Sequence, residues 1–248
     1  SFRKLSHEAS QTKLMTWQSP FSAVFFDLDG TLVDTAIEFI LVVQSIRAEQ
    51  NLQPLADSKI RERVSDGANA LVKLALGIEE SDPNFSSHRE NFLALYKEIA
   101  GSKCVPFSGI LSLIKCLGER KIKWGIATNK PRIYTNAIIE NINFKPMPNI
   151  VVCPEDVINP KPSPEALLFS CEKLKCKPNE AVYIGDHARD IAAGRNAGMY
   201  TIAASYGYIS NQDTPHVWGA HALASNVQEL NRLLISSSSR LKEVELEH

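Results

Sequence analysis

Four short apolar runs, separated by segments with helical patterns, restrict the fold of this chain more than any other feature. They are Ala23–Phe26, Lys123–Ala127, Ala181–Ile184 and Tyr200–Ala203, with Ile150–Cys153 as a shorter fifth run. These runs lack the period-two alternation of a strand with one solvated face, so they predict strands buried on both faces of a parallel sheet. The pattern predicts an α/β chain with a three-layer, Rossmann-like core.

The segments between these strands have the spacing of helices. The predicted core helices cover Ile110–Arg120, Pro131–Asn141, Pro164–Leu174, Ala188–Ala197 and Val227–Leu234. Helices that alternate with parallel strands pack on the two faces of the sheet, which is the arrangement that the buried strands require.

One long segment breaks this alternation. From about Thr35 to Lys103 the helical patterns continue without a strand, in the runs Ala36–Gln50, Ser58–Val64, Ala68–Leu76 and Phe85–Ala100. The simplest interpretation is an all-helical domain inserted after the first strand. We therefore divide the chain into a discontinuous α/β core at residues 1–34 and 104–239, a helical cap domain at 35–103, and a tail at 240–248.

The two ends of the chain carry features outside the predicted core. Ser236–Ser239 is a serine run that predicts a frayed linker to the tail. Leu246–His248 resemble the start of an expression tag, and Met15 is an alternative start that would leave a disordered arm before it. No apolar run is long enough for a signal peptide or a membrane span.

Charge and cysteine content restrict the partners and the compartment. The chain has 27 Lys and Arg against 28 Asp and Glu, without the basic surplus or stripe that nucleic-acid binding requires. We therefore expect neither a nucleic-acid nor a membrane partner, and the oligomeric state stays open. Five scattered cysteines without a Cys-x-x-Cys pair predict reduced thiols in a cytoplasmic protein.

The most informative motif is Phe25–Thr31, in which Asp27 and Asp29 follow an apolar strand and precede a Gly-Thr turn. In open α/β sheets, ligands bind beyond the carboxyl ends of the strands. Neighbouring carboxylates repel each other unless a cation neutralises them or they share a proton. Mg²⁺ prefers such oxygen ligands and also bridges to phosphate oxygens, so the motif predicts a magnesium site.

The later strand ends supply further polar groups. Thr128 and Asn129 follow the second long strand and offer a hydroxyl and backbone amides to phosphoryl oxygens. Lys161 lies in a proline-stiffened loop, where its charge can balance a carboxylate and a phosphate together. Asp186 and Asp190 follow the next long strand and add two carboxylates to the predicted cation site.

Each of these features has an ordinary structural interpretation as well. Thr and Asn favour turns, a single lysine is usually solvated, and Asp is common at helix starts for capping. Four such features at the ends of four strands, in this order, are poorly explained by four separate coincidences. We therefore favour the functional interpretation.

With these four motifs the chain resembles the haloacid dehalogenase superfamily, from Phe21 to about Leu234. The resemblance implies that the inserted segment is that superfamily's helical cap. It also implies a Mg²⁺-dependent transfer of a phosphoryl group onto Asp27, the nucleophile. Asp29 would be the general acid and base, with its backbone carbonyl on the metal.

The same resemblance implies the remaining site residues. The metal ligands would be Asp27, Asp29, Asp186 and Asp190. The groups that hold the phosphoryl oxygens would be Gly30, Thr128, Asn129 and Lys161. Thr128 and Lys161 also count as catalytic, because positioned charges and donors stabilise the phosphoryl group during transfer.

Asp29 also separates the activities of the superfamily. The namesake dehalogenases lack a carboxylate at the matching position, so a phosphomonoester hydrolase is the leading prediction. Two alternatives remain. One is a sugar phosphomutase, which would need a bisphosphate activator, and the other is a non-catalytic binding protein on the same fold.

Two finer resemblances concern the small-molecule phosphomonoester substrate. Phosphoglycolate phosphatases, the leading prediction, are similar at Thr31–Thr35, Asp66–Val72 and Thr128–Pro131. Bacterial N-acetylmuramic acid 6-phosphate phosphatases, the alternative, are similar at Val64–Ala68, Tyr206–Ile209 and Trp218–Ala220.

A loop between two cap helices is predicted to reach the end of the substrate remote from the phosphate. Its residues are Ser65, Asp66, Gly67, Ala68 and Asn69. A glycine there permits close approach of a ligand to the backbone. Arg61 and Arg63 are nearby candidates for binding a substrate carboxylate.

Overall fold

A parallel six-stranded sheet forms the centre of the computed structural model, which describes residues 21–244 and the side chains of residues 21–235. The strands are β1 (Ala23–Phe26), β4 (Lys123–Ala127), β5 (Ile150–Val152), β6 (Ala181–Gly185), β7 (Tyr200–Ala204) and β8 (Ala222–Ala224), in the order β5-β4-β1-β6-β7-β8. All five predicted strands are therefore confirmed within one residue. The sequence analysis missed β8, because its residues Ala-Leu-Ala lack the β-branched and aromatic side chains that are typical of strands.

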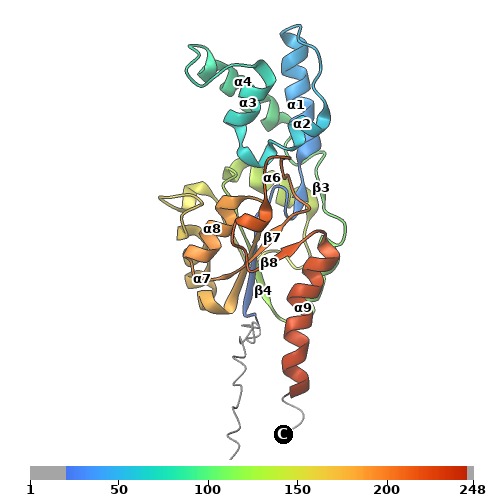
Figure 1. Cartoon of the computed structure of the whole chain (residues 1–248), viewed down its shortest axis with the longest axis vertical. Coiled ribbons are helices and arrows are strands. Elements are labelled where there is room, and N and C mark those ends of the chain that lie inside the picture. The colour runs from blue at the N-terminus through green and yellow to red at the C-terminus, as the bar shows by residue number, and fades with distance from the viewer. Residues whose placement is uncertain (1–20, 245–248) are drawn as a thin grey trace, which may run out of the picture.

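Helices of the core cover both faces of the sheet (Figure 1). They are α5 (Ile110–Glu119), α6 (Arg132–Ile142), α7 (Glu165–Leu174), α8 (Ala188–Asn196) and α9 (Val227–Val244). Val24 and Phe26 of β1 pack in the cluster that contains residues of α5, α6 and α9. Ala23 and Phe25 pack on the opposite face with α7 and α8, which gives the predicted three-layer, Rossmann-like core.

Helix α9 differs from the prediction at its end. It continues ten residues past Leu234 and crosses both the serine run Ser236–Ser239 and the predicted core boundary at residue 239. The predicted frayed linker is therefore wrong. Serine costs a helix only a few tenths of a kcal/mol relative to alanine, so four serines do not end a helix that is already formed.

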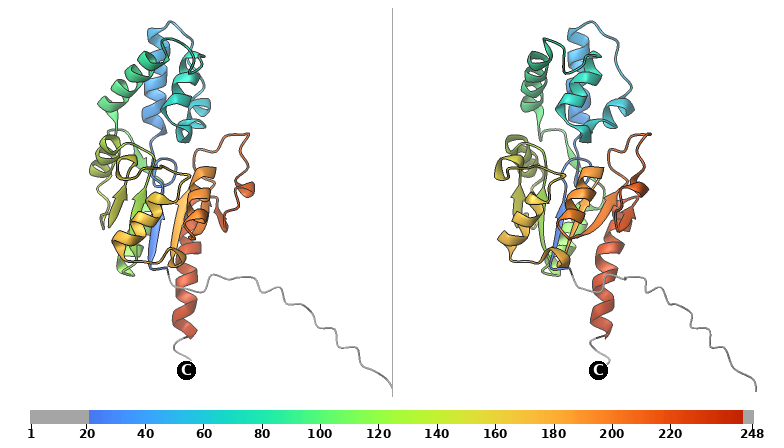
Figure 2. Two further views of the ribbon diagram at one scale, coloured as in Figure 1. Left: turned by 90° about the vertical axis from the view of Figure 1, so that its left-hand side faces the viewer. Right: turned by 60° about the vertical axis from the view of Figure 1, so that its left-hand side comes forward.

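The inserted segment forms a helical cap above the sheet (Figures 1 and 2). Its helices are α1 (Ala36–Glu49), α2 (Asp57–Arg61), α3 (Ala68–Leu76) and α4 (Phe85–Ile99), with a 3₁₀ turn at Val64–Asp66. Helix α2 ends three residues before its predicted end. The cap has its own hydrophobic cluster, which includes Phe39, Phe92 and Tyr96.

Two short antiparallel strands mark the passage between core and cap. Val33 of β2 (Val33–Asp34) pairs with Pro106, and Asp34 pairs with Val105 of β3 (Val105–Pro106). The chain therefore enters and leaves the predicted cap, residues 35–103, at adjacent points. This two-stranded connection was also not predicted, because two residues carry no periodicity.

Within residues 21–244, none of the helices combines the length and the apolar character that crossing a bilayer requires. The proposed alternative start at Met15 and the tag-like residues Leu246–His248 lie outside the described part of the chain.

Candidate active site

Three buried carboxylates meet beyond the carboxyl ends of the strands. Asp27 follows β1, Asp186 follows β6, and Asp190 lies in the first turn of α8. One oxygen from each lies within 4.8 Å of the others, and all three side chains are buried. The parallel register explains the meeting, because Phe26 of β1 lies beside Ile184 of β6.

Lys161 is the cation beside this cluster. Its Nζ lies 2.9 Å from Asp27 Oδ1 and 2.7 Å from Asp190 Oδ1. It also lies 2.7 Å from the Tyr183 hydroxyl and 3.0 Å from the carbonyl oxygen of Ala127. Burial opposes the charge of Lys161, but the charges of Asp190 and Asp27 outweigh it and raise the pKa of the ammonium.

One lysine does not neutralise three carboxylates. Burial, followed by the negative charge of Asp190, raises the pKa of Asp27 to about 6. Burial and the charge of Asp27 raise the pKa of Asp186 well above its usual range. Both shifts reflect the burial of these carboxylates and, after it, the repulsion between their negative charges.

The excess charge fits a divalent cation. Asp186 Oδ1 is buried and has no hydrogen-bond partner among the described residues. An orphaned buried carboxylate oxygen is costly unless an ion or water satisfies it. Three carboxylates are hard oxygen donors of the kind that Mg²⁺ and Ca²⁺ prefer, so the residues present fit such an ion.

Asp29 lies apart from this cluster, at the edge of the cavity. Its Oδ1 accepts hydrogen bonds from Lys130 Nζ at 2.9 Å and from the Thr35 hydroxyl at 2.6 Å. Its Oδ2 accepts none from the described residues. The side chain of Asp29 is therefore not part of the carboxylate cluster, and only the predicted backbone contact with a metal remains open for it.

The two residues after β4 have different surroundings. Thr128 is buried and lines the cavity, and its hydroxyl accepts a hydrogen bond from the Lys130 amide at 3.0 Å. The side chain of Asn129 makes two 3.0 Å hydrogen bonds with the backbone of Lys161. That side chain therefore positions the lysine loop. A phosphoryl contact from Asn129 would have to use its backbone N–H.

Gly30 has a different role from the predicted phosphate contact. Its N–H donates to the Val33 carbonyl at 3.0 Å, so its one donor is already used. Its φ is +76°, and a Cβ atom there would lie 2.2 Å from Asp186 Oδ2. The structure therefore supports close packing beside Asp186 as the reason for glycine and does not support a phosphate contact.

The predicted cap loop reaches the core. The Ser65 hydroxyl donates to Asp186 Oδ2 at 2.8 Å, and Asp66 lies 3.2 Å from His187 Nε2. Arg189 donates to the Ser65 carbonyl. The other loop residues contact the cavity or its wall: Gly67 and Ala68 line it, and Asn69 holds Arg89.

The arginines nearest this loop in sequence, Arg61 and Arg63, are not among the residues that line the cavity. Arg61 forms two hydrogen bonds with Asp34, at 3.1 and 3.0 Å, and Arg63 pairs with Asp66 at 3.2 Å. The structure thus gives both predicted carboxylate-binding arginines a partner inside the protein. The arginines that line the cavity are Arg89 and Arg189, which the sequence analysis did not select.

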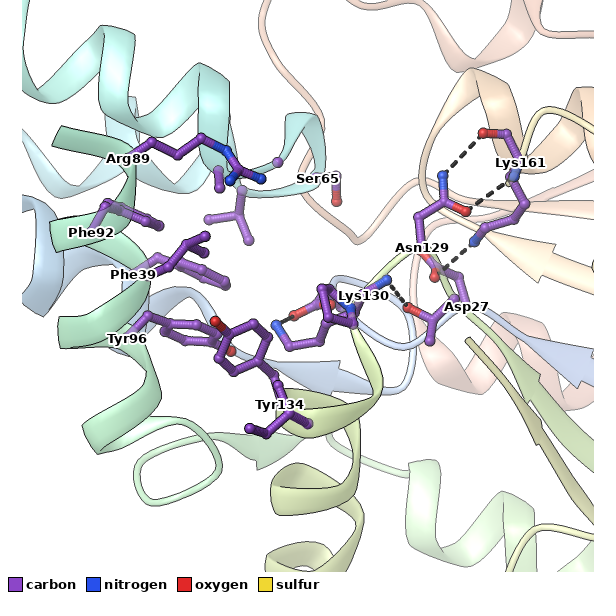
Figure 3. A pocket seen from close by; sticks show the side chains of 18 of the residues that line it. Asp27, Phe39, Ser65, Arg89, Phe92, Tyr96, Asn129, Lys130, Tyr134 and Lys161 are labelled. Atoms are coloured by element: carbon purple, nitrogen blue, oxygen red, sulfur yellow. Dashed lines mark hydrogen bonds and ion pairs between the residues drawn. The ribbon is translucent and has the colours of Figure 1, made fainter. Parts of the chain in front are cut away.

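A cavity of about 350 Å³ separates cap and core (Figure 3). Its core side carries Asp27, Asp29, Thr128, Asn129, Lys130 and Lys161. Its cap side carries Phe39, Phe92, Tyr96 and Arg89. Lys130, also missed from the sequence, connects the two sides, because its Nζ bonds Asp29 and lies over the rings of Phe39 and Tyr96. No sequence motif indicated these cap residues, which the packing of the helices brings together.

Comparison with known proteins identifies relatives along most of the chain. The family model described as haloacid dehalogenase-like hydrolase matches residues 24–204. The N-acetylmuramic acid 6-phosphate phosphatase of Pseudomonas aeruginosa is 38% identical over 208 residues, which cover 84% of this chain and 92% of that protein. The phosphoglycolate phosphatase of Xylella fastidiosa is 31% identical over 209 residues, which cover 84% of this chain and 91% of that protein.

Solved structures support the fold. A haloacid dehalogenase superfamily hydrolase of subfamily IA, variant 1, from Geobacter sulfurreducens superposes with a TM-score of 0.68 at 20% identity. The superposition covers 87% of this chain and 97% of that one. At this identity the likeness concerns the architecture of core and cap.

Proposed function

The chain belongs to the haloacid dehalogenase-like hydrolase family, and from this premise we propose that it hydrolyses a phosphomonoester through an aspartyl-phosphate on Asp27. The observation that carries the proposal is the contact of Asp27 with Lys161 inside the buried carboxylate cluster. A carboxylate held by a fixed ammonium, open to the cavity, is placed to attack a phosphoryl group.

The first step transfers the phosphoryl group. A carboxylate oxygen of Asp27 forms a bond to phosphorus as the bond between phosphorus and the ester oxygen breaks. Asp29 donates a proton to the departing oxygen through Oδ2, because Lys130 and Thr35 occupy only Oδ1. Lys161 and the Thr128 hydroxyl stabilise the charge on the phosphoryl oxygens during the transfer.

The second step releases phosphate. Asp29, now ionised, takes a proton from a water molecule as that water attacks phosphorus, and the bond to Asp27 breaks. The Asp29 side chain therefore serves in turn as acid and base. The two hydrogen bonds to its Oδ1 keep the carboxylate facing the cavity in both steps.

We propose Mg²⁺ as the ion that fits the cluster. Asp27, Asp186 and Asp190 would hold it, together with the backbone carbonyl of Asp29, and Asp190 would act directly or through water. Bound there, the ion neutralises the charge of the carboxylates and of the phosphate. Two observations support the proposal of Mg²⁺: the excess negative charge of the cluster and the unpartnered oxygen of Asp186.

The proposed substrate is a small phosphorylated carboxylic acid. Relatives of this chain are named for phosphoglycolate and for N-acetylmuramic acid 6-phosphate, and both compounds carry a carboxylate as well as a phosphate. We place the enzyme in the cytoplasm, which the five free cysteines support, because reduced thiols are typical of that compartment. Neither nucleic acid nor a membrane is among its proposed partners.

Phosphate release from these two substrates, with Mg²⁺ and with EDTA, tests the proposal. We expect release that requires the divalent ion and falls at least about a thousand-fold in Asp27→Asn. An acid-quenched reaction should show a phosphoryl group on the peptide that contains Asp27. Asp29→Asn, a matched loss of one charge, should slow both steps without abolishing the labelling of Asp27, because the nucleophile is still present.

Other outcomes would contradict the proposal. Conversion of a sugar phosphate to its isomer, dependent on a bisphosphate and without free phosphate, would indicate the phosphomutase. Tight binding of a phosphomonoester without turnover or labelling of Asp27 would indicate the non-catalytic binding protein.

A further inference from the structure

Helix α4 presents one face to the cavity, and this face changes character along its length. Tyr96, Phe92 and Arg89 are spaced four and three residues apart, so they lie on the same side of the helix. All three line the cavity. Tyr96 is nearest the proposed reaction site, since Lys130 Nζ lies 4.6 Å from its ring centre and 2.9 Å from Asp29.

Arg89 stands at the far end of this face. It is seven residues before Tyr96, and an α-helix rises about 1.5 Å per residue, so the two Cα atoms are about 10 Å apart along the axis. Figure 3 shows Arg89 on the cap side, across the cavity from Asp27 and Lys161. A ligand that contacts both Tyr96 and Arg89 would therefore extend along this face of the helix.

Arg89 is held in place and its charge is not neutralised. Its Nε donates to Asn69 Oδ1 at 2.7 Å, and it forms no ion pair with any residue in the described part of the chain. The two cavity lysines differ, because Lys130 pairs with Asp29 and Lys161 pairs with Asp27. A tethered guanidinium with free terminal nitrogens is suited to bind a carboxylate with two parallel hydrogen bonds.

Between the two ends the cavity wall is aromatic. The ring of Phe39 stacks on Tyr96 with centres 4.3 Å apart and lies nearly parallel to Phe92 with centres 6.3 Å apart. The faces of such rings pack against flat, largely apolar surfaces, as the C–H face of a sugar ring is. The cavity of about 350 Å³ lies at the lower end of the ~300–1,000 Å³ typical of pockets for such ligands.

From this arrangement we infer that Arg89 is a specificity-determining residue that binds a carboxylate on the leaving group, and that the substrate class is a sugar monophosphate bearing a carboxylic acid across the ring from the phosphate. The inference rests on the proposed function, because it assumes that the phosphate lies at Asp27. N-acetylmuramic acid 6-phosphate has this shape. In 2-phosphoglycolate a single carbon separates the carboxylate from the ester oxygen, so we expect it to leave Arg89 without a contact.

Binding to the Asp27→Asn protein separates this inference from turnover. Calorimetric titrations with Mg²⁺ compare N-acetylmuramic acid 6-phosphate with N-acetylglucosamine 6-phosphate, the same sugar without the acid. We expect the acid to bind at least about 10-fold more tightly, as for a hydrogen bond between charged groups. When Arg89→Gln is added to Asp27→Asn, this preference should disappear. The affinity for 2-phosphoglycolate should stay within about twofold of that of the Asp27→Asn protein.

Lys97→Gln is the matched control, because it removes a charge from an exposed position of the same helix that does not line the cavity. It should leave the preference intact, and Arg89→Lys should keep part of it. Equal affinity of the two sugars, no binding of either, or an equal loss for 2-phosphoglycolate in Arg89→Gln would overturn the inference. If the preference depends on Arg89 but the wild type hydrolyses none of these compounds, the proposed function fails and the subsite stands.

Discussion

The core side and the cap side of the cavity carry different kinds of side chains. On the core side Asp27, Lys161 and Asp190 are nearly inaccessible to solvent, and Lys161 bonds directly to both carboxylates. On the cap side the wall is a stack of aromatic rings, and its one described arginine, Arg89, is exposed and tethered only to Asn69. The core side thus concentrates charge, and the cap side supplies shape.

This difference has a physical reason. Phosphoryl transfer needs charges fixed before the reaction begins, and burial makes each of them both stronger and costlier to leave unpaired. Selection of a substrate needs surfaces that match the leaving group, and such surfaces work through area and a few polar contacts. Substitutions on the core side should therefore be costly, and those on the cap side mild.

The largest contrast is expected between the two cavity lysines. Lys161→Met leaves Asp27 and Asp190 buried without a cation, which should lower the free energy of unfolding by about 3–5 kcal/mol. Lys130→Met removes one partner from Asp29, which keeps its bond to Thr35, and should cost about 1–2 kcal/mol. Urea denaturation at pH 7 in EDTA measures both. Equal losses would show that the buried carboxylate cluster is no more sensitive to a lost cation than the edge of the cavity where Lys130 pairs with Asp29.

The second effect concerns pH. Unfolded Asp27 ionises near pH 3.8, whereas the folded residue keeps its proton to about pH 6. Between these values the folded state binds more protons, so the stability of the metal-free protein falls as pH rises, by an amount of the order of 3 kcal/mol. Asp186, whose pKa is raised for the same reason, extends the loss to higher pH.

Denaturation in EDTA from pH 4 to 8 should show this fall. Mg²⁺ should reverse it at pH 8, because the ion binds the ionised carboxylates, and Asp27→Asn should flatten the lower part of the curve. Stability that rises with pH across this range in EDTA would contradict the described charge excess.

A pair of glycines gives the third contrast. Gly30→Ala places a Cβ atom 2.2 Å from Asp186 Oδ2 at a φ of +76°, so clash and backbone strain should together cost about 2–3 kcal/mol and weaken Mg²⁺ binding. Gly67→Ala in the cap loop also has a positive φ, of +90°, but no atom lies within 4 Å of the new Cβ. Its ψ of 179° puts it in a backbone region that is almost exclusive to glycine, so strain alone predicts a cost of about 1–3 kcal/mol.

Thermal unfolding and Mg²⁺ titration of both variants measure this contrast. The core variant should lose affinity for the ion, and the cap variant should keep it. The reverse result would mean that the cap loop, through Ser65 and Asp186, controls the ion more than the packing around Gly30 does.

The smallest effect is expected at Tyr96. Its hydroxyl is buried without a hydrogen-bond partner among the described residues, and its ring makes the contacts with Phe39 and Lys130. Tyr96→Phe should therefore change the free energy of unfolding by no more than about 0.5 kcal/mol and leave hydrolysis of a sugar substrate unchanged. A loss above tenfold in kcat/KM would reveal a contact between this hydroxyl and the substrate.

Much of the core site could be inferred from the sequence because the positions and ends of the strands along the chain are local properties. A buried parallel strand appears as an uninterrupted apolar run, and the residue after it lies at the ligand-binding edge. Asp27, Asp186 and Asp190 were therefore selected correctly as neighbours, and all five predicted strands were found. Local pattern also located every helix of the cap, although not each of its ends.

Only the tertiary structure decided which side chains of the cap and loops face the site. Ser65 meets Asp186 across 121 residues, and the Tyr208 hydroxyl bonds the backbone of Thr35 across 173. No sequence pattern distinguishes Arg61 from Arg89, since both are arginines in the helical cap. Asp34 forms an ion pair with Arg61, whereas Arg89 bonds only Asn69 among the described residues and stays unpaired in the cavity. Local periodicity determines which face of a helix is buried, but the packing of distant elements determines what that face meets.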